Sequence, residues 1–192
     1  AVVREETNAG GIVSLRHFRS TDWGITHSSA EIFTASDDRY PVCAYSNETG
    51  TDSIYIAVER GISLTEHEIR LIATSETPLT NYTIRYITDA APGTMYERPS
   101  ITIQQRHFSL PQRILVTCTK NNRAVYHYSN DGGAVWTIDA NLGSPLQQVD
   151  YTFCSSDSLA AGDKDFIAAF VDLNGDSITV RHGDLGNMGT MQ

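Results

Sequence analysis

Short runs in which apolar and polar residues alternate recur along the whole chain, and no segment sustains the period of an amphipathic helix. Three pairs of these runs are separated by a few turn-forming residues, as at Asn174-Gly175. Asn-Gly between alternating apolar runs is a strong hairpin signal. The pairs are 40–46 with 52–58, 113–119 with 123–128, and 165–172 with 176–181. The pattern predicts an all-β chain built from antiparallel hairpins.

Further strand-like runs surround these hairpins. Those that precede a hairpin lie at 30–35, 99–104 and 149–154, and those that follow one lie at 68–73 and 135–139. A unit of about four antiparallel strands therefore repeats along the chain. Another run, at 82–87, is bounded by proline and glycine turn signals. It indicates an insertion at about 75–98 that carries one strand.

One turn carries a specific motif, Ser129-x-Asp131-x-Gly133-x-x-Trp136, directly after the run 123–128. An aspartate side chain can accept bonds from the NH groups of a turn, glycine adopts a positive φ, and a large aromatic ring anchors a loop by burial. These residue types at this spacing therefore predict a tight turn that is fixed to the body of the fold.

Weaker copies of this turn lie elsewhere in the chain. Ser20, Asp22 and Gly24 keep the full spacing near the N-terminus, with His27 in place of the tryptophan, and Asp184 and Gly186 keep part of it near the C-terminus. At 58–62 only the strand and the turn remain. Positions 22, 60, 131 and 184 lie 38, 71 and 53 residues apart, near the length of a four-stranded unit with one insertion.

The motif resembles the Asp-box of the sialidase (BNR repeat) β-propeller superfamily, in which this turn joins the third and fourth strands of a blade and the tryptophan packs between blades. The resemblance implies an all-β β-propeller of sialidase-like four-stranded antiparallel blades. The chain has about three and a half to four of them, in a single domain or propeller portion over residues 1–192. An unrelated β-sandwich with similar turns is the competing interpretation.

The number of blades is small for this family, which normally has six or more. The resemblance leaves three arrangements open: blades supplied by another chain, a longer polypeptide, or an unusually small four-bladed ring. An unclosed arc of blades exposes sheet faces and edges. We therefore expect self-association or a partner chain that completes the propeller.

Composition narrows the partners further. The 192 residues carry a net charge of −9 and are 40% hydrophobic, so the chain is long enough to bury a sizeable core. The negative charge argues against binding of nucleic acid or an anionic membrane surface, and no apolar run is long enough to span a membrane. We expect no cofactor, and the family resemblance favours an extracellular or virion-surface setting.

The cysteines and one acidic loop are the obvious candidates for metal chemistry. Cys43, Cys118 and Cys154 each lie inside a predicted strand, and no histidine or cysteine partner sits at ligand spacing. They predict buried thiols. The segment 172–176 reads Asp-Leu-Asn-Gly-Asp and is similar to the opening of a calcium loop, but it lacks the later ligands. The Asn-Gly hairpin explains it, and we expect no metal site.

In the resembling family the ligand face lies at the end opposite the Asp-box turns, near the starts of the innermost strands. Here this end includes Tyr96, Glu97 and Arg98, the candidate ligand-binding residues, and the loops 47–51, 120–122 and 173–176. The segment is similar to a sialidase Arg-Ile-Pro motif whose arginine clamps a carboxylate. Arg98, however, directly precedes the proline, and a one-residue shift in a strand reverses the side-chain face. Arg98 is therefore a clamp or a salt-bridge residue at the rim.

Two functions fit these residues. The first is a glycan-recognising or assembly module, such as a phage, viral or secreted bacterial adhesin. The alternative is a glycoside hydrolase of the sialidase type, with exo or endo action. A retaining sialidase needs a tyrosine nucleophile paired with a glutamate, and Tyr86, Tyr96 and Glu97 are candidates. No motif fixes a catalytic residue, and the displaced arginine favours recognition.

Overall fold

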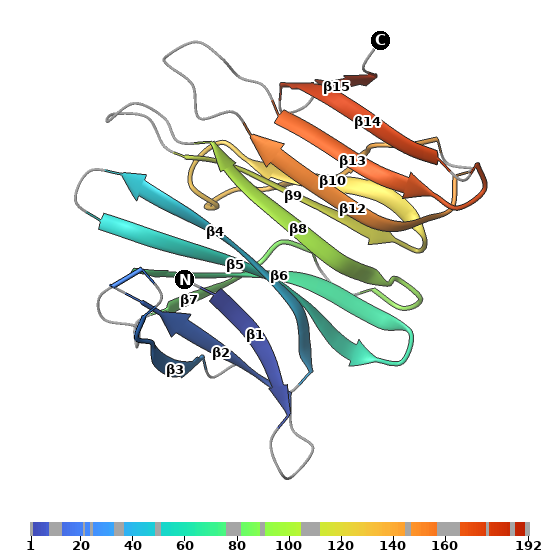
Figure 1. Ribbon diagram of the computed structural model, residues 1–192. Helices are drawn as coiled ribbons and strands as arrows, with labels where there is room; N and C mark the ends of the chain where they lie inside the picture. Colours follow the sequence, from blue (N-terminus) through green and yellow to red (C-terminus); the bar gives the residue numbers. More distant parts are fainter. Residues whose placement is uncertain are drawn as a thin grey trace.

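Among the described residues, fifteen antiparallel strands form four sheets, and no helix is present (Figure 1). The computed structural model describes residues 2–7, 13–20, 22–23, 25–32, 37–48, 51–75, 82–88, 91–104, 112–144, 147–156, 166–175, 177–184 and 187–190. This part of the chain contains no helix that is long and apolar enough to cross a membrane. The all-β prediction is confirmed.

Each sheet is a meander of strands that follow one another in the chain. Sheet A contains β1 (Val2–Thr7), β2 (Val13–Arg19) and β3 (Ser28–Ile32). Sheet B contains β4 (Asp38–Glu48), β5 (Thr51–Ser63), β6 (Glu66–Ser75) and β7 (Tyr82–Tyr86). Sheet C contains β8 (Tyr96–Gln104), β9 (Arg113–Lys120), β10 (Arg123–Ser129) and β11 (Thr137–Asn141). Sheet D contains β12 (Val149–Ser156), β13 (Phe166–Asp172), β14 (Ser177–Asp184) and β15 (Asn187–Thr190).

Neighbouring sheets pack face to face through three apolar clusters, one between each pair. Successive side chains of β9 point to opposite faces of sheet C, so this strand contributes to two clusters. Leu115 packs with sheet D, whereas Ile114 and Val116 pack with sheet B. Strands buried on both faces read as nearly continuous apolar runs. Accordingly, β5 contains the apolar run Ile54–Val58 and β9 contains the apolar run Ile114–Val116.

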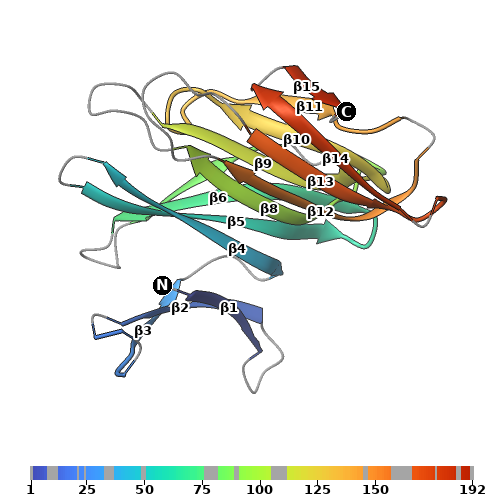
Figure 2. The ribbon, with the colours of Figure 1, turned by 45° about the horizontal axis from the view of Figure 1, so that its top comes forward.

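The first strands of sheets B, C and D contact one another along one side of the molecule, as β4 with β8 and β8 with β12 (Figure 2). The starts of these strands therefore lie near one another at one end. We call this the bulge end, because each of the three strands has a β-bulge there. The Ser129–Trp136 turn follows the last residue of β10 and lies at the opposite end of sheet C. We call this the turn end.

Several boundaries differ from those expected from the sequence. The run expected at 30–35 overlaps β3, which pairs with β2 and not with β4. Residues 58–62 lie within β5, so the turn copy expected there is wrong. The strand expected at 82–87 exists as β7 and is the fourth strand of sheet B. A short β15 completes sheet D. The alternation of apolar and polar residues located the strands, but it did not assign them to the correct sheets. Sheet B begins one strand later than expected, at β4, and ends with β7 as its fourth strand.

With the strands assigned in this way, the aspartate turns recur at a more regular spacing. In sheet B, the position between the third and fourth strands falls at residues 76–81, outside the described residues. The remaining positions, Asp22, Asp131 and Asp184, then fit a repeat of about 54 residues. The loop 47–51, expected at the ligand end, includes the turn from β4 to β5 and so lies at the opposite end of these strands.

Candidate functional site

The Ser129–Trp136 turn is held together by its own side chains. The Ser129 hydroxyl donates to Asp131 Oδ1 (2.7 Å) and accepts the NH of Gly133 (2.8 Å). Asp131 Oδ1 also accepts the NH groups of Ala134 (3.0 Å) and Val135 (2.9 Å). The NH of Val135 and the Ser129 hydroxyl, which favour the charged form, hold the pKa of Asp131 below its usual value. The motif residues thus satisfy the backbone of the turn.

The Ser20 turn has the same pattern. Ser20 donates to Asp22 Oδ1 (2.7 Å), which accepts the NH of Thr26 (2.9 Å), and Asp22 Oδ2 accepts the Thr26 hydroxyl (2.5 Å). The hydroxyl and NH of Thr26 are the main reasons that the pKa of Asp22 falls to about 2. Gly24 lies outside the described residues.

Two motif residues connect the Ser129 turn to sheet B. Trp136 packs against the cluster between sheets B and C, and its ring NH donates to the carbonyl of Gly133 (3.1 Å). Gly133 has a φ of 87°, and a Cβ there would lie 3.3 Å from Leu71 and 3.5 Å from Ile114. Arg85 of β7 donates to the carbonyl of Gly132 (3.1 Å). Only glycine fits at position 133.

Asp184 has a different role from Asp131. Its Oδ1 accepts a charge-assisted bond from Arg113 Nη2, and Arg113 also bonds Asn130 Oδ1 and Gln104 Oε1 (each 3.1 Å). Arg113 is buried at the start of β9, so Asp184 links sheets D and C. Gly186 lies outside the described residues.

At the bulge end, β4, β8 and β12 each carry a β-bulge at the same register position. One extra residue interrupts the pairing with the second strand of each sheet, at Tyr40-Pro41, Arg98-Pro99 and Asp150-Tyr151. Proline cannot donate to a ladder and is tolerated at bulges, and the residues before both prolines have a positive φ, 49° at Tyr40 and 53° at Arg98. Bulges commonly redirect side chains near binding sites.

The three bulges line one pocket of about 300 Å³. Tyr40, Tyr151 and Phe153 contribute exposed aromatic rings, and Arg98 contributes its guanidinium. Arg98 Nη1 bonds the side chain of Asp150 and its carbonyl (3.2 Å), and the guanidinium lies 4.5 Å from the centre of the Tyr151 ring. Arg98 thus bridges sheets C and D. Its bulged NH donates to Glu59 Oε2 of sheet B (3.1 Å).

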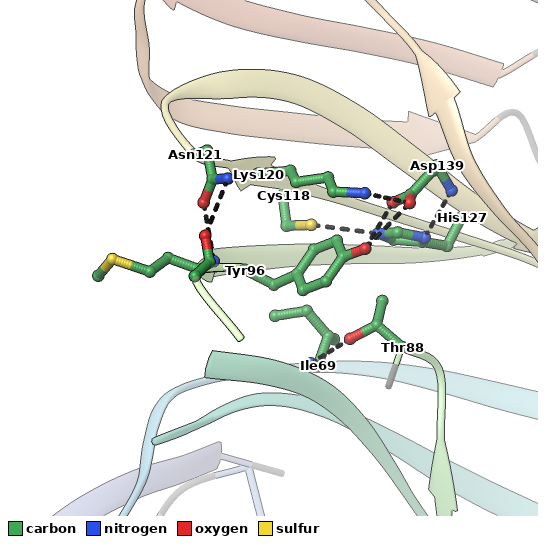
Figure 3. A network of polar contacts seen from close by, with 10 residues as sticks. Ile69, Thr88, Tyr96, Cys118, Lys120, Asn121, His127 and Asp139 are labelled. Atoms are coloured by element: carbon green, nitrogen blue, oxygen red, sulfur yellow. Dashed lines mark hydrogen bonds and ion pairs between the residues drawn. The ribbon is translucent and has the colours of Figure 1, made fainter. Parts of the chain in front are cut away.

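A row of polar side chains crosses sheet C, with one residue from each strand (Figure 3). The hydroxyl of Tyr96 donates to Asp139 (2.9 Å to Oδ1), and Lys120 forms an ion pair with Asp139 Oδ2. Burial is the main reason that the pKa of Tyr96 rises to about 12. Tyr96 therefore stays protonated near neutral pH and donates to Asp139.

His127 completes the row inside the core. A bulge in β11 turns the NH of Asp139 away from the ladder, and this NH donates to His127 Nδ1 (3.2 Å). Nδ1 is therefore the acceptor, so the ring proton sits on Nε2, 3.2 Å from Cys118 Sγ. Burial lowers the pKa of His127 to about 4 and raises that of Cys118. Both groups are neutral at neutral pH.

These contacts bear on the candidate nucleophiles. Tyr96 is 3% exposed and its hydroxyl is occupied by Asp139. Tyr86 is exposed on β7, where Arg70 stacks on its ring at 4.8 Å. Asp139 accepts the Tyr96 hydroxyl as a general base would, but Tyr96 is buried, so its oxygen is not presented to a ligand.

Glu97 belongs to a separate cluster. Glu59, His67 and Glu97 each offer one ligand-type atom, and these three atoms lie within 4.8 Å of one another. Among the described residues, these are the ones that could hold a metal ion. No spacing in the sequence indicated this cluster, because Glu59 and His67 meet across the β5–β6 hairpin and Glu97 comes from the next sheet.

The cysteines and the acidic loop, for which no metal site was expected, lie outside this cluster. Cys43, Cys118 and Cys154 are free and lie in strands, but Cys43 is exposed, so burial was wrongly expected for it. Asp172 accepts the NH of Asn174 (3.0 Å) and the amide of Gln147 (2.8 Å). These bonds are those of a hairpin turn.

No protein-family model matches this chain, and no curated protein matches its sequence. The X-Pro pairs at 40–41 and 98–99 are the signal that could have revealed the bulge pocket from the sequence, because proline inside a strand marks a bulge or an edge.

Proposed function

We propose that this chain is a glycan-binding module built from sialidase-like β-propeller blades, and that the bulge pocket takes the sugar. The repeated bulge carries the proposal, because it brings equivalent positions of three first strands into one pocket. The consecutive four-stranded meanders, each packed on the next, support the propeller part.

The chemistry of the pocket suits a carbohydrate. The rings of Tyr40, Tyr151 and Phe153 offer flat apolar faces for the CH groups of a sugar. Arg98 Nη1 is occupied by Asp150, but a guanidinium has further donors on Nη2 and Nε. These donors suit sugar hydroxyls or a carboxylate.

Titration calorimetry with sialyllactose and lactose tests this proposal. We expect Arg98→Ala and Tyr40→Ala to weaken binding by about tenfold or more, near 1.4 kcal/mol each. Tyr45→Ala is the matched control, because Tyr45 is an exposed ring on β4 that does not line the pocket. Equal loss in Tyr45→Ala, or no binding across a wider glycan panel, would disprove it.

The hydrolase alternative is tested by turnover of a fluorogenic sialoside. The burial of Tyr96 speaks against a tyrosine nucleophile at this position. We expect no turnover by the wild-type chain. Turnover that disappears in Arg98→Ala would establish the hydrolase instead.

Assembly is the second part of the proposal and rests on sheet D. Ile167 and Ile178 are exposed on its face away from sheet C, where Val171 aligns with Ile178. Sheets B and C pack such apolar faces on a neighbouring sheet. The proposed occupant of this face is a sheet of a second copy of the chain.

Native mass spectrometry tests the assembly. We expect the wild-type chain to form a dimer or larger ring at micromolar concentration, and Ile178→Lys to shift it to monomer while its circular dichroism stays unchanged. A monomeric wild type would disprove this part and leave glycan binding untouched.

A further inference from the structure

Glu59, His67 and Glu97 come from β5, β6 and β8 and meet at the bulge end between sheets B and C. His67 Nδ1 lies 3.0 Å from Glu59 Oε1 and 3.9 Å from Glu97 Oε1. Two ligand atoms of a tetrahedral zinc ion, at bond lengths of about 2.0–2.1 Å, lie about 3.3 Å apart. The observed separations bracket this value, so the three atoms can surround one ion after small side-chain movements.

His67 Nδ1 lacks the hydrogen-bond partner that a buried polar atom normally has. This atom is buried and makes no hydrogen bond, although a carboxylate oxygen of Glu59 lies 3.0 Å away. Buried polar atoms are nearly always bonded. A nitrogen that faces two carboxylates without bonding either is placed as a ligand of a cation would be.

Two of the three groups in the cluster are carboxylates. Glu59 is only 4% exposed in its side chain and lies beside a second carboxylate, Glu97. A bound cation removes the penalty of placing two carboxylates together in a buried site.

The backbone holds two of the ligands in place. Glu59 Oε2 accepts the NH of Arg98 (3.1 Å), which leaves Oε1 directed at His67. The NH of His67 donates to the carbonyl of Thr94 (3.0 Å), which fixes the end of β6 against sheet C. Such outer contacts orient metal ligands and tune affinity.

We propose that Glu59, His67 and Glu97 bind a divalent transition-metal ion, with Zn²⁺ as the best fit. Imidazole with two carboxylates suits transition metals more than Ca²⁺ or Mg²⁺. Glu59 and His67 also line a cavity of about 400 Å³, formed by the tip of the β5–β6 hairpin with Asp37 and Arg39. With three protein ligands, the fourth position of the ion faces this cavity and takes water or an oxygen ligand.

The test uses the full chain after removal of metals with a chelator. We expect titration calorimetry with ZnCl₂ at pH 7.5 to give one ion per chain, and His67→Ala to weaken binding at least about tenfold. Glu97→Gln keeps the size of the side chain and removes one charged ligand, so it tests the site even if His67→Ala fails to fold. Binding of Co²⁺ should give the intense visible bands of a tetrahedral site.

His27→Ala is the control for adventitious binding, because His27 is exposed and lies outside the cluster. The proposal is overturned if the wild-type chain binds no Zn²⁺, if Glu97→Gln binds as tightly as the wild type, or if His27→Ala loses as much affinity as His67→Ala. Tighter binding of CaCl₂ than of ZnCl₂ would overturn the choice of ion class. Glycan binding by Arg98 and Tyr40 is measured independently, so either proposal can fail alone.

Discussion

The two ends of the sheets differ in how they use polar side chains. At the turn end, Ser129 and Asp131 bond the backbone of their own turn, and Arg113 joins neighbouring sheets. At the bulge end, strand irregularities release backbone NH groups, and side chains converge on two cavities. The recognisable motif therefore lies at the end that stabilises the sheets, and the proposed binding sites lie at the other end.

Substitution of Gly133 at the turn end should have the largest effect on stability. Gly133→Ala combines an unfavourable positive φ with a Cβ that would lie 3.2 Å from Arg85 Nη1 and 3.3 Å from Leu71, closer than most Cβ contacts. We expect a loss of about 3 kcal/mol in the free energy of unfolding, measured by denaturant titration. Glycan and zinc binding should remain, because this residue lies at the turn end.

Gly132→Ala is the matched control for this change. Gly132 also has a positive φ, 72°, but a Cβ there meets nothing within 4 Å. Only the backbone cost remains, about 1–2 kcal/mol. Equal losses in the two variants would show that packing at position 133 is unimportant, and loss of ligand binding in either would break the separation of the two ends.

The buried His127 makes stability depend on pH. Its pKa is about 4 in the folded chain and 6.5 ordinarily, so the unfolded chain takes up a proton first as pH falls. The stabilisation is complete above about pH 6.5 and is lost between about pH 6.5 and 4, by about 3 kcal/mol. Denaturant titrations across this range should show a shallower pH dependence in His127→Gln. An identical dependence in both chains would contradict the neutral, buried state.

Tyr96→Phe has the smallest expected effect. It tests whether Tyr96 at the bulge end only stabilises the fold or also binds glycan. It removes a hydroxyl that donates to Asp139 but keeps the ring. We expect a loss of about 1 kcal/mol of stability and unchanged glycan affinity in calorimetry. A large loss of glycan affinity in a chain with near wild-type stability would place Tyr96 in the binding site.

The sequence predicted contacts between residues that are close along the chain, but not contacts between distant segments. Alternation and the Asn-Gly and Lys-Asn-Asn turns located the hairpins β9–β10 and β13–β14 correctly, because these signals are local. The assignment of strands to sheets was displaced around β3 and β7, because every strand in a meander has the same local pattern. Short alternating runs do not identify the partner of a strand.

The candidate sites were even less accessible from the sequence. Arg98 was identified as a candidate, but its stacking on Tyr151 and its bond to Asp150 depend on a sheet that lies fifty residues away along the chain. Glu59, His67 and Glu97 share no spacing rule, because a hairpin register and a sheet-to-sheet contact bring them together. Only the repeated X-Pro pairs carried a local signal for the bulge end.

The meander topology also has a kinetic consequence. Each sheet consists of consecutive strands, so its pairing requires the closure only of the loops between neighbouring strands. Such local pairing favours faster folding than long-range strand pairing does. During synthesis, sheet A can pair as soon as β3 has left the ribosome, and each later sheet then meets an already formed surface on which to pack.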